Sequence, residues 1–235
     1  MTVRSAASRL RRAESFELPR DRVSRVEPTS SRPTHWDRVY TSKSERDVSW
    51  FEPMPHVSLA MLDAAGLTPQ WCVVDIGGGD SRLIDQLIQR GLTCLAVLDV
   101  SRAAIERAQA RLGDASHVPT WMVADVTDDW TLKPMDAWHD RAVFHFLTEP
   151  EDRKRYVDQA KRTVKVGGTV IIATFAPDGP RKCSGLPVVQ YSPESLAHEL
   201  GADFSLVQAQ PHMHQTPWGT AQSFQYSRFI YEGSP

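Results

Sequence analysis

The sequence predicts an α/β fold of three layers, in which helices cover both faces of a doubly wound, mostly parallel seven-stranded sheet that ends in a C-terminal antiparallel hairpin. Three observations predict it. From Trp71 onwards an apolar run, a glycine turn and a periodic helix follow one another. Strand-like and helix-like stretches then alternate, with short links, as far as Thr174. Two final stretches, 204–212 and 222–231, alternate apolar and polar residues.

Length and composition limit the number of domains and the classes of partner. The chain has 235 residues and a formal net charge of −2, which suits one domain of about 200 residues plus a tail. Its acidic balance disfavours nucleic acid as a partner. No apolar run reaches the roughly 18 residues that cross a bilayer, so we expect a cytoplasmic protein without membrane contact. The oligomeric state stays open.

The three cysteines, Cys72, Cys94 and Cys183, lie far apart in the sequence. They form no Cys-x-x-Cys pattern and no disulfide framework, so the sequence predicts no metal site. Two of them fall in predicted strands, where a free cysteine behaves as a small buried apolar residue.

Residues 1–33 are rich in Arg, Ser and Pro, and we expect a disordered, Arg-rich tail. The domain then spans 34–235. Its first part, 34–66, reads as helices: Thr34 can cap a short helix, and a second helix ends at Gly66. Four aromatic residues stand in this part, Trp36, Tyr40, Trp50 and Phe51. Ordinary core packing is the alternative reading for each of them.

The glycine turn follows a strand that ends at Ile76, and it consists of Gly77, Gly78 and Gly79. Glycine suits such a turn because it adopts positive φ and lets a ligand approach the backbone closely. Asp99 stands 20 positions after Gly79, at the end of the second apolar run, where a carboxylate can accept hydrogen bonds from both hydroxyls of a ribose. Turn and acid together predict a cofactor that contains a nucleoside.

The remaining elements follow in order. Serines cap three helices, which Gly91, Gly113 and Gly201 end. Strand three covers 120–124, and strand four covers 136–141 and runs into 142–147. A helix from Pro150 through Val164 turns at Gly167–Gly168 into strand five, 169–174. The link 176–191 is long enough to be a lid. The three capping serines are Ser81, Ser101 and Ser192.

The pattern Asp75-x-Gly77-x-Gly79 resembles the first motif of the class I, Rossmann-like S-adenosylmethionine-dependent methyltransferases, except that Ser81 replaces the third glycine. The resemblance covers about residues 35–231. It implies a strand order of 3-2-1-4-5-7-6 and S-adenosylmethionine as the cofactor. Asp75 would help to place the positively charged methionine half. It also implies cofactor contacts from the glycine turn and from five further residues: Asp99, Val100, Asp125, Val126 and Asp140.

The family's elements before the first strand fold over the cofactor and wall the substrate pocket. Trp36, Tyr40, Trp50 and Phe51 are therefore implied as pocket residues.

Strand four brings titratable side chains to its carboxyl end, which we expect to face the reactive methyl group of the cofactor. His139, Asp140 and His145 are candidates for a general base, and a histidine has the more suitable ordinary pKa. Arg141 could hold an acidic substrate group, orient Asp140, or form a purely structural pair with it. His212 and His214 share one face of a predicted strand and could line the same pocket, or be core or surface residues.

The implied activity is in-line methyl transfer. A small-molecule acceptor is the first expectation, because the chain lacks the Asn/Asp-Pro-Pro-Tyr signature of amino-methylating nucleic-acid enzymes. A protein lysine side chain is the second expectation. The third is a non-catalytic module that binds S-adenosylmethionine or a partner.

Overall fold

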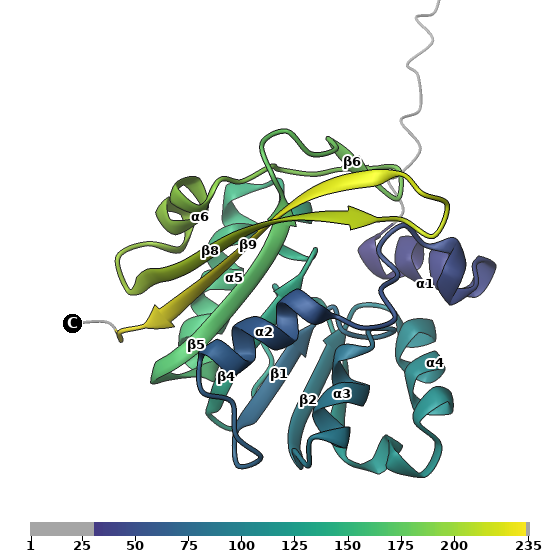
Figure 1. The fold of residues 1–235 in the computed structure, drawn as a ribbon, viewed down its shortest axis with the longest axis horizontal. Coiled ribbons are helices and arrows are strands. Elements are labelled where there is room, and N and C mark those ends of the chain that lie inside the picture. The colour runs from purple at the N-terminus through teal and green to yellow at the C-terminus, as the bar shows by residue number, and fades with distance from the viewer. Residues whose placement is uncertain (1–30, 234–235) are drawn as a thin grey trace, which may run out of the picture.

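The central sheet has the strand order β3-β2-β1-β4-β5-β9-β8 (Figure 1). The computed structural model describes residues 31–233. Strands β1 to β5 run parallel, β9 pairs antiparallel with β5, and β8 pairs antiparallel with β9. The predicted fold class and strand order are confirmed. The strand bounds are β1 Cys72–Ile76, β2 Cys94–Asp99, β3 Pro119–Val123, β4 Met135–Arg141, β5 Val164–Phe175, β8 Phe204–Gln215 and β9 Ala221–Tyr231.

Helices cover both faces of this sheet. Helices α2 and α3 pack on the face that carries Val73 and Val97, and α5 and α6 pack on the face that carries Val74 and Leu98. Because neighbours along a strand point to opposite faces, β1 and β2 contribute to both cores. The helix bounds are α1 Arg32–Ser42, α2 His56–Ala64, α3 Leu83–Gln89, α4 Arg102–Leu112, α5 Pro150–Thr163 and α6 Pro193–Leu200.

Shorter elements join these layers. Three turns of 3-10 helix cover Glu45–Asp47, Gly113–His117 and Phe144–Phe146. The long link 176–191 contains a two-stranded hairpin, β6 Lys182–Cys183 and β7 Leu186–Pro187. Figure 1 shows α1 beyond the carboxyl ends of β1 and β2, close to the tip of the β8–β9 hairpin.

Local capping signals placed the helices well. The Ser101 hydroxyl accepts a hydrogen bond from the backbone N–H of Ala104 at 3.2 Å, at the start of α4. Ser192 accepts from the N–H of Ser195, also at 3.2 Å, and opens α6 with Pro193 at its first position. Ser81 accepts from the N–H of Leu83, at the first residue of α3.

Several boundaries differ from the sequence expectation: 142–147 does not continue strand four but contains the 3-10 turn Phe144–Phe146, and two other differences change an element's start. Strand β5 already begins at Val164, so the glycine pair predicted as a turn lies inside the strand, at an irregularity where the β4–β5 register shifts. Gly167 has φ +81°, which only glycine adopts readily, and this lets the irregular strand continue. Helix α1 begins at Arg32, inside the segment expected to be tail.

The structure also corrects the expectation for the cysteines. Cys72 and Cys94 form a disulfide. They are in-register partners on the parallel strands β1 and β2, with Cα atoms 4.6 Å apart. Their separation of 22 residues gave no sign of this, because strand register decides it. Cys183 is a free, buried cysteine.

The predicted disorder of residues 1–30 lies outside the described residues. Within 31–233, no helix has the length and apolar character that crossing a bilayer would require. The cytoplasmic location stays a prediction.

Candidate active site

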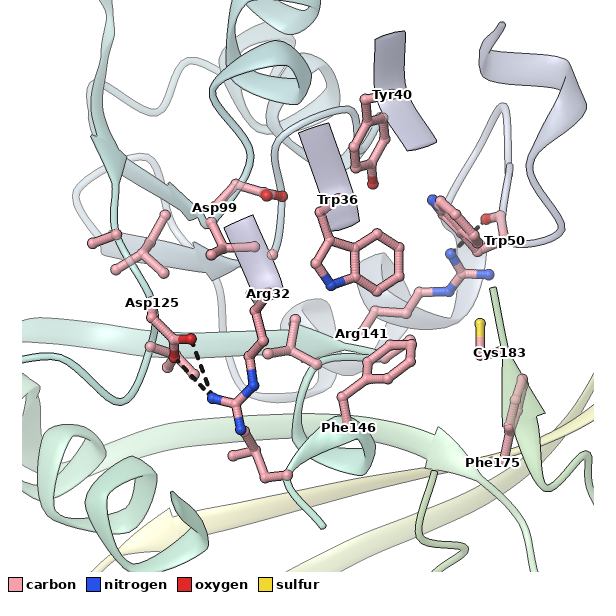
Figure 2. A pocket seen from close by; sticks show the side chains of 18 of the residues that line it. Arg32, Trp36, Tyr40, Trp50, Asp99, Asp125, Arg141, Phe146, Phe175 and Cys183 are labelled. Atoms are coloured by element: carbon pink, nitrogen blue, oxygen red, sulfur yellow. Dashed lines mark hydrogen bonds and ion pairs between the residues drawn. The ribbon is translucent and has the colours of Figure 1, made fainter. Parts of the chain in front are cut away.

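A pocket opens at the carboxyl ends of the parallel strands, beneath α1 (Figure 2). One end, which the sequence predicts to hold a nucleoside and which we call the nucleoside end, is formed after β1, β2 and β3 by Gly77, Asp99, Val100, Asp125 and Val126. Its other end is formed by α1, by the segment after β4, and by β5 and β9. Ligands of doubly wound sheets bind at this edge because the strand order reverses there.

The glycine turn leaves no room for side chains. Gly77 has φ +66°, and a Cβ there would collide with the side chain of Val143. A Cβ on Gly79 would stand 2.7 Å from Oδ2 of Asp99. The backbone N–H of Gly79 instead donates to that oxygen at 3.0 Å. Glycine is therefore required here for close approach as well as for backbone conformation.

Asp99 is fixed by the backbone and still faces the pocket. Its Oδ1 accepts from the N–H of Ser101 at 2.8 Å, and its Oδ2 accepts from Gly79. Burial raises the pKa of Asp99 to about 6, against the lowering effect of these two hydrogen bonds. Each carboxylate oxygen has a further lone pair with which it can accept a ribose hydroxyl.

Asp125 lies at the neighbouring edge of the pocket. Its Oδ1 accepts from the N–H and the hydroxyl of Thr127, and Nη1 of Arg32 lies 3.1 Å from its Oδ2. Burial acts against ionisation, but the hydrogen bonds from Thr127 and the charge of Arg32 outweigh it and lower the pKa of Asp125. Arg32 also pairs with Asp152. Sequence analysis missed Arg32 because a helix start without an apolar stripe reads like a tail.

Asp75 lies beneath the glycine turn and lines an adjoining cavity with His139. Its Oδ1 accepts from Nδ1 of His139 at 2.7 Å, and Nε2 of His139 lies 2.8 Å from the hydroxyl of Ser58. Both ring nitrogens are therefore engaged within the fold. The other oxygen of Asp75 is buried and has no hydrogen-bond partner among the described residues. It is a prepared acceptor for a cationic ligand group.

Asp140 is turned away from the pocket. Its Oδ1 accepts from the N–H of Val143, and its Oδ2 accepts from the N–H of Phe144 and the hydroxyl of Tyr156, at 2.8 to 3.0 Å. Burial raises its pKa to about 6. Its oxygens close the turn after β4 and are not part of the pocket lining, so its role toward the acceptor or the cofactor stays a prediction.

His145 is also turned into the protein. It is fully buried against the ring of Phe175, and its Nδ1 accepts from the N–H of that residue at 3.3 Å. Burial, and then the charge of Arg141, lower the pKa of His145 to about 3. Its side chain is not part of the pocket lining, and its role as a general base stays a prediction.

Arg141 is the strand-four residue that does line the pocket. Its Nη1 donates to the carbonyl of Trp50 at 2.8 Å, and its Nε donates to the hydroxyl of Tyr226 at 3.0 Å. Its Nη2 lies 3.5 Å from Oε2 of Glu52. The expected pairing with Asp140 is absent from the described contacts, because successive residues of a strand point to opposite faces.

The predicted lid aromatics divide into two groups. Trp36, Tyr40 and Trp50 line the pocket, whereas Phe51 lines the adjoining cavity. Trp36 packs edge-on against Trp50 and Phe146, with ring centroids 5.7 and 5.1 Å apart. Together with two residues from the sheet these rings form what we call the aromatic wall: Trp36, Trp50, Phe146, Phe175 and Phe224.

Sequence analysis missed the second half of this wall. Phe175 stands at the end of β5 and Phe224 pairs with it on β9, so neither has a local motif. Cys183, from the long link, also lines the pocket, and burial raises its pKa to about 11. The link 176–191 thus contributes one described residue to the pocket lining, and its role as a lid stays a prediction. His212 and His214 lie outside the pocket lining and approach Glu52 instead.

Comparison with known proteins agrees with this geometry. Residues 73–168, which run from β1 into β5, match the family described as a methyltransferase domain. Residues 73–168 are therefore similar to a methyltransferase domain, and the sheet that contains them has the strand order that the resemblance implied. The resemblance drawn from the glycine motif is confirmed.

Curated relatives match over part of their length. An uncharacterized methyltransferase of Mycobacterium tuberculosis is 30% identical over 117 residues, which are 49% of this chain and 56% of the relative. The chain thus spans little more than half of that protein. The EEF1A lysine methyltransferase 2 of Danio rerio is 26% identical over 155 residues, covering 60% of this chain and 66% of that protein.

Solved structures share the fold. A protein from a study of the conversion of a disulfide bond into a thioacetal group during echinomycin biosynthesis has a TM-score of 0.67 and 21% identity, over 85% of this chain and 93% of that chain. The N-methyltransferase NodS of Bradyrhizobium japonicum, in complex with S-adenosylhomocysteine, has a TM-score of 0.63 and 17% identity, over 83% and 97%.

Proposed function

We propose that this chain binds S-adenosylmethionine and transfers its methyl group to a small, largely apolar acceptor. The observation that carries the proposal is the continuity of one pocket, which joins the nucleoside end at Asp99 and Asp125 to the aromatic wall. A module that only binds the cofactor would need the nucleoside end alone. A methyltransferase needs both, because donor and acceptor must be held in line.

The residues fit this cofactor. Asp99 offers lone pairs to the two ribose hydroxyls, and Asp125 offers an acceptor to the adenine amine when its contact with Arg32 is exchanged. The unpartnered oxygen of Asp75 suits the ammonium of the methionine half. When bound, S-adenosylmethionine supplies an activated methyl group with a neutral thioether as its leaving group.

The acceptor end favours a particular kind of nucleophile. Among the described residues that line the pocket, carboxylates stand only at the nucleoside end, and neither Asp140 nor His145 belongs to the lining. The wall offers flat apolar contact, and the charge of Arg141 stands at its edge. We therefore favour an acceptor whose reacting atom carries a free lone pair at neutral pH, such as a ring nitrogen or a thiolate.

A protein lysine is the second candidate, and the identity with the Danio rerio lysine methyltransferase supports it. A lysine amine is protonated at neutral pH and must lose a proton before it can attack. The pocket side chains described above offer no evident base for that step. The small-molecule acceptor therefore ranks first.

The test has two stages. Calorimetry should detect binding of S-adenosylhomocysteine and none of NAD; the opposite result would remove the assignment of the cofactor. Labelled S-adenosylmethionine is then incubated with a panel of aromatic amines, heterocycles and thiols, and separately with a cell lysate. Label in small molecules supports the first candidate, and label only in protein supports the second.

A further inference from the structure

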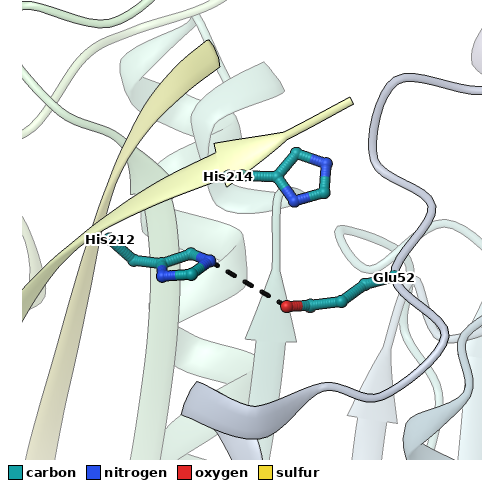
Figure 3. Close-up of side chains that lie close together, drawn as sticks. All are labelled: Glu52, His212 and His214. Atoms are coloured by element: carbon teal, nitrogen blue, oxygen red, sulfur yellow. Dashed lines mark ion pairs between the residues drawn. The ribbon is translucent and has the colours of Figure 1, made fainter. Parts of the chain in front are cut away.

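A second cluster of chemically active side chains lies behind the aromatic wall. Glu52, His212 and His214 each direct one potential ligand atom into the same space, and these atoms lie within 4.8 Å of one another. Glu52 belongs to the segment between the first 3-10 helix and α2, and both histidines belong to β8. Figure 3 shows the three side chains converging from these two directions.

The arrangement follows from strand geometry. His212 and His214 are two positions apart on β8, so their side chains emerge on the same face. Beyond the pairing of Phe175 with Phe224, β8 and β9 continue as a two-stranded hairpin toward the N-terminal segment. There His214 reaches the carbonyl oxygen of Ser49, with Nε2 at 2.7 Å from it. The hairpin and the N-terminal segment are thereby joined at the cluster.

This hydrogen bond also prepares His214 as a ligand. A carbonyl can only accept, so Nε2 carries the proton and Nδ1 keeps its lone pair. Figure 3 shows the second ring nitrogen on the side of His212 and Glu52. Metal-bound histidines are commonly oriented in this way, by donation from the other nitrogen to a backbone carbonyl.

The third candidate ligand, the carboxylate of Glu52, is oriented by Arg141. Oε2 of Glu52 lies 3.5 Å from Nη2 of Arg141, whereas its Oε1 lies 3.9 Å from Nε2 of His212. One oxygen is thus engaged with the guanidinium, and the other faces the histidines. The positive charge of Arg141 opposes a second cation, but Arg141 also interacts with the carboxylate of Asp75, which offsets part of that charge.

We propose that Glu52, His212 and His214 bind one divalent transition-metal ion of the zinc type. Two neutral imidazoles and one carboxylate form a donor set that suits Zn²⁺, whereas Mg²⁺ and Ca²⁺ prefer oxygen alone. Three protein ligands leave a coordination position for water or another small ligand, as in metal sites that are not purely structural.

The experiment measures metal binding without cofactor or acceptor, so its failure would leave the proposed methyl transfer untouched. Untagged, chelator-treated protein is titrated with Zn²⁺ by calorimetry. About one ion per chain should bind. His212→Ala and His214→Ala should each lower the affinity at least about 100-fold, because loss of a ligand costs more than the 10- to 100-fold typical of outer contacts. Glu52→Gln should weaken binding as well.

Two controls separate this site from other zinc-binding groups. His198→Ala removes an exposed histidine of α6 and should leave the affinity unchanged. Cys183→Ser removes the free thiol, which lies near Ser49, and should also leave it unchanged. Melting curves without metal show whether each variant is folded. In the parent, Zn²⁺ should raise the melting temperature, because it binds the folded chain.

Three results would overturn the proposal. One is a dissociation constant weaker than about 1 mM for the parent protein. Another is undiminished binding in folded His212→Ala and His214→Ala variants. The last is loss of binding in Cys183→Ser alone, which would place the ion on the thiol.

Discussion

Asp99 is the last residue of β2, and Asp140 is the second-last residue of β4. Both therefore stand at the same edge of the sheet, yet their side chains make different contacts. Both are buried, with 4% and 0% exposure, and burial raises the pKa of each to about 6. Asp99 accepts two backbone N–H groups and keeps capacity toward the pocket. Asp140 accepts two N–H groups and a hydroxyl, all from the fold. A raised pKa therefore does not by itself mark a catalytic acid.

The difference arises from the direction of each side chain. In β4 the side chain of Asp140 shares a face with Trp138, whose indole N–H donates to the hydroxyl of Tyr156 at 2.8 Å. The same tyrosine donates to Asp140, which joins strand and helix into one buried network. Arg141, one position further, points to the opposite face and reaches the pocket. One residue of register thus separates a structural carboxylate from a pocket residue.

The largest effect should come from Asp140→Ala. It leaves two backbone N–H groups and the hydroxyl of Tyr156 without an acceptor, and each unsatisfied buried group costs about 1–3 kcal/mol. We expect a loss of at least about 3 kcal/mol in the free energy of unfolding, or roughly 6 °C or more in melting temperature. Thermal melting measures it. Normal melting combined with lost turnover would instead restore Asp140 as a catalytic residue.

Asp99→Ala should act mainly on the affinity for the cofactor. Loss of hydrogen bonds between the ribose hydroxyls and a charged acceptor should cost about 1.5–3 kcal/mol, or roughly 10- to 150-fold in affinity for S-adenosylhomocysteine. Some stability should also be lost, since the N–H groups of Gly79 and Ser101 lose their acceptor. Calorimetry on the variant decides the matter, and unchanged affinity would mean that Asp99 does not hold the ribose.

The pH dependence of cofactor binding should follow Asp99 and not Asp140. The pKa of Asp99 is raised to about 6, and its ionised form is the better acceptor for two hydroxyls. Protonation below pH 6 therefore removes binding energy, so affinity should fall by up to about tenfold per pH unit, or 1.4 kcal/mol. Calorimetry from pH 7.5 to 5 measures this. In Asp99→Asn the break near pH 6 should disappear; a break that persists would assign it to another group.

The smallest effect should come from Arg32→Ala. The Arg32 side chain is 34% exposed, and its pairs with Asp125 and Asp152 are correspondingly screened. Such pairs contribute about 0–1 kcal/mol. Because the substitution frees Asp125 for the adenine amine, affinity for S-adenosylhomocysteine should rise by no more than about fivefold. A large fall in affinity would show that Arg32 belongs to the cofactor site itself.

Much of this protein follows from the sequence alone. The glycine turn, the spacing from Gly79 to Asp99 and the capping residues Ser101 and Ser192 are local signals, because each depends on contacts within a few residues or on one strand–helix–strand unit. The strand order followed from the family resemblance together with the final alternating stretches. These signals located the nucleoside end of the pocket.

Only the tertiary structure decided the rest. The direction of Asp140, the disulfide between Cys72 and Cys94, and the meeting of Glu52 with His214 depend on strand register and on packing between distant segments. The same holds for the half of the aromatic wall supplied by β5 and β9. Sequence pattern records which residues are apolar and at what period. It does not record which strand lies opposite which, and that pairing determines which side chains form the aromatic wall of the pocket.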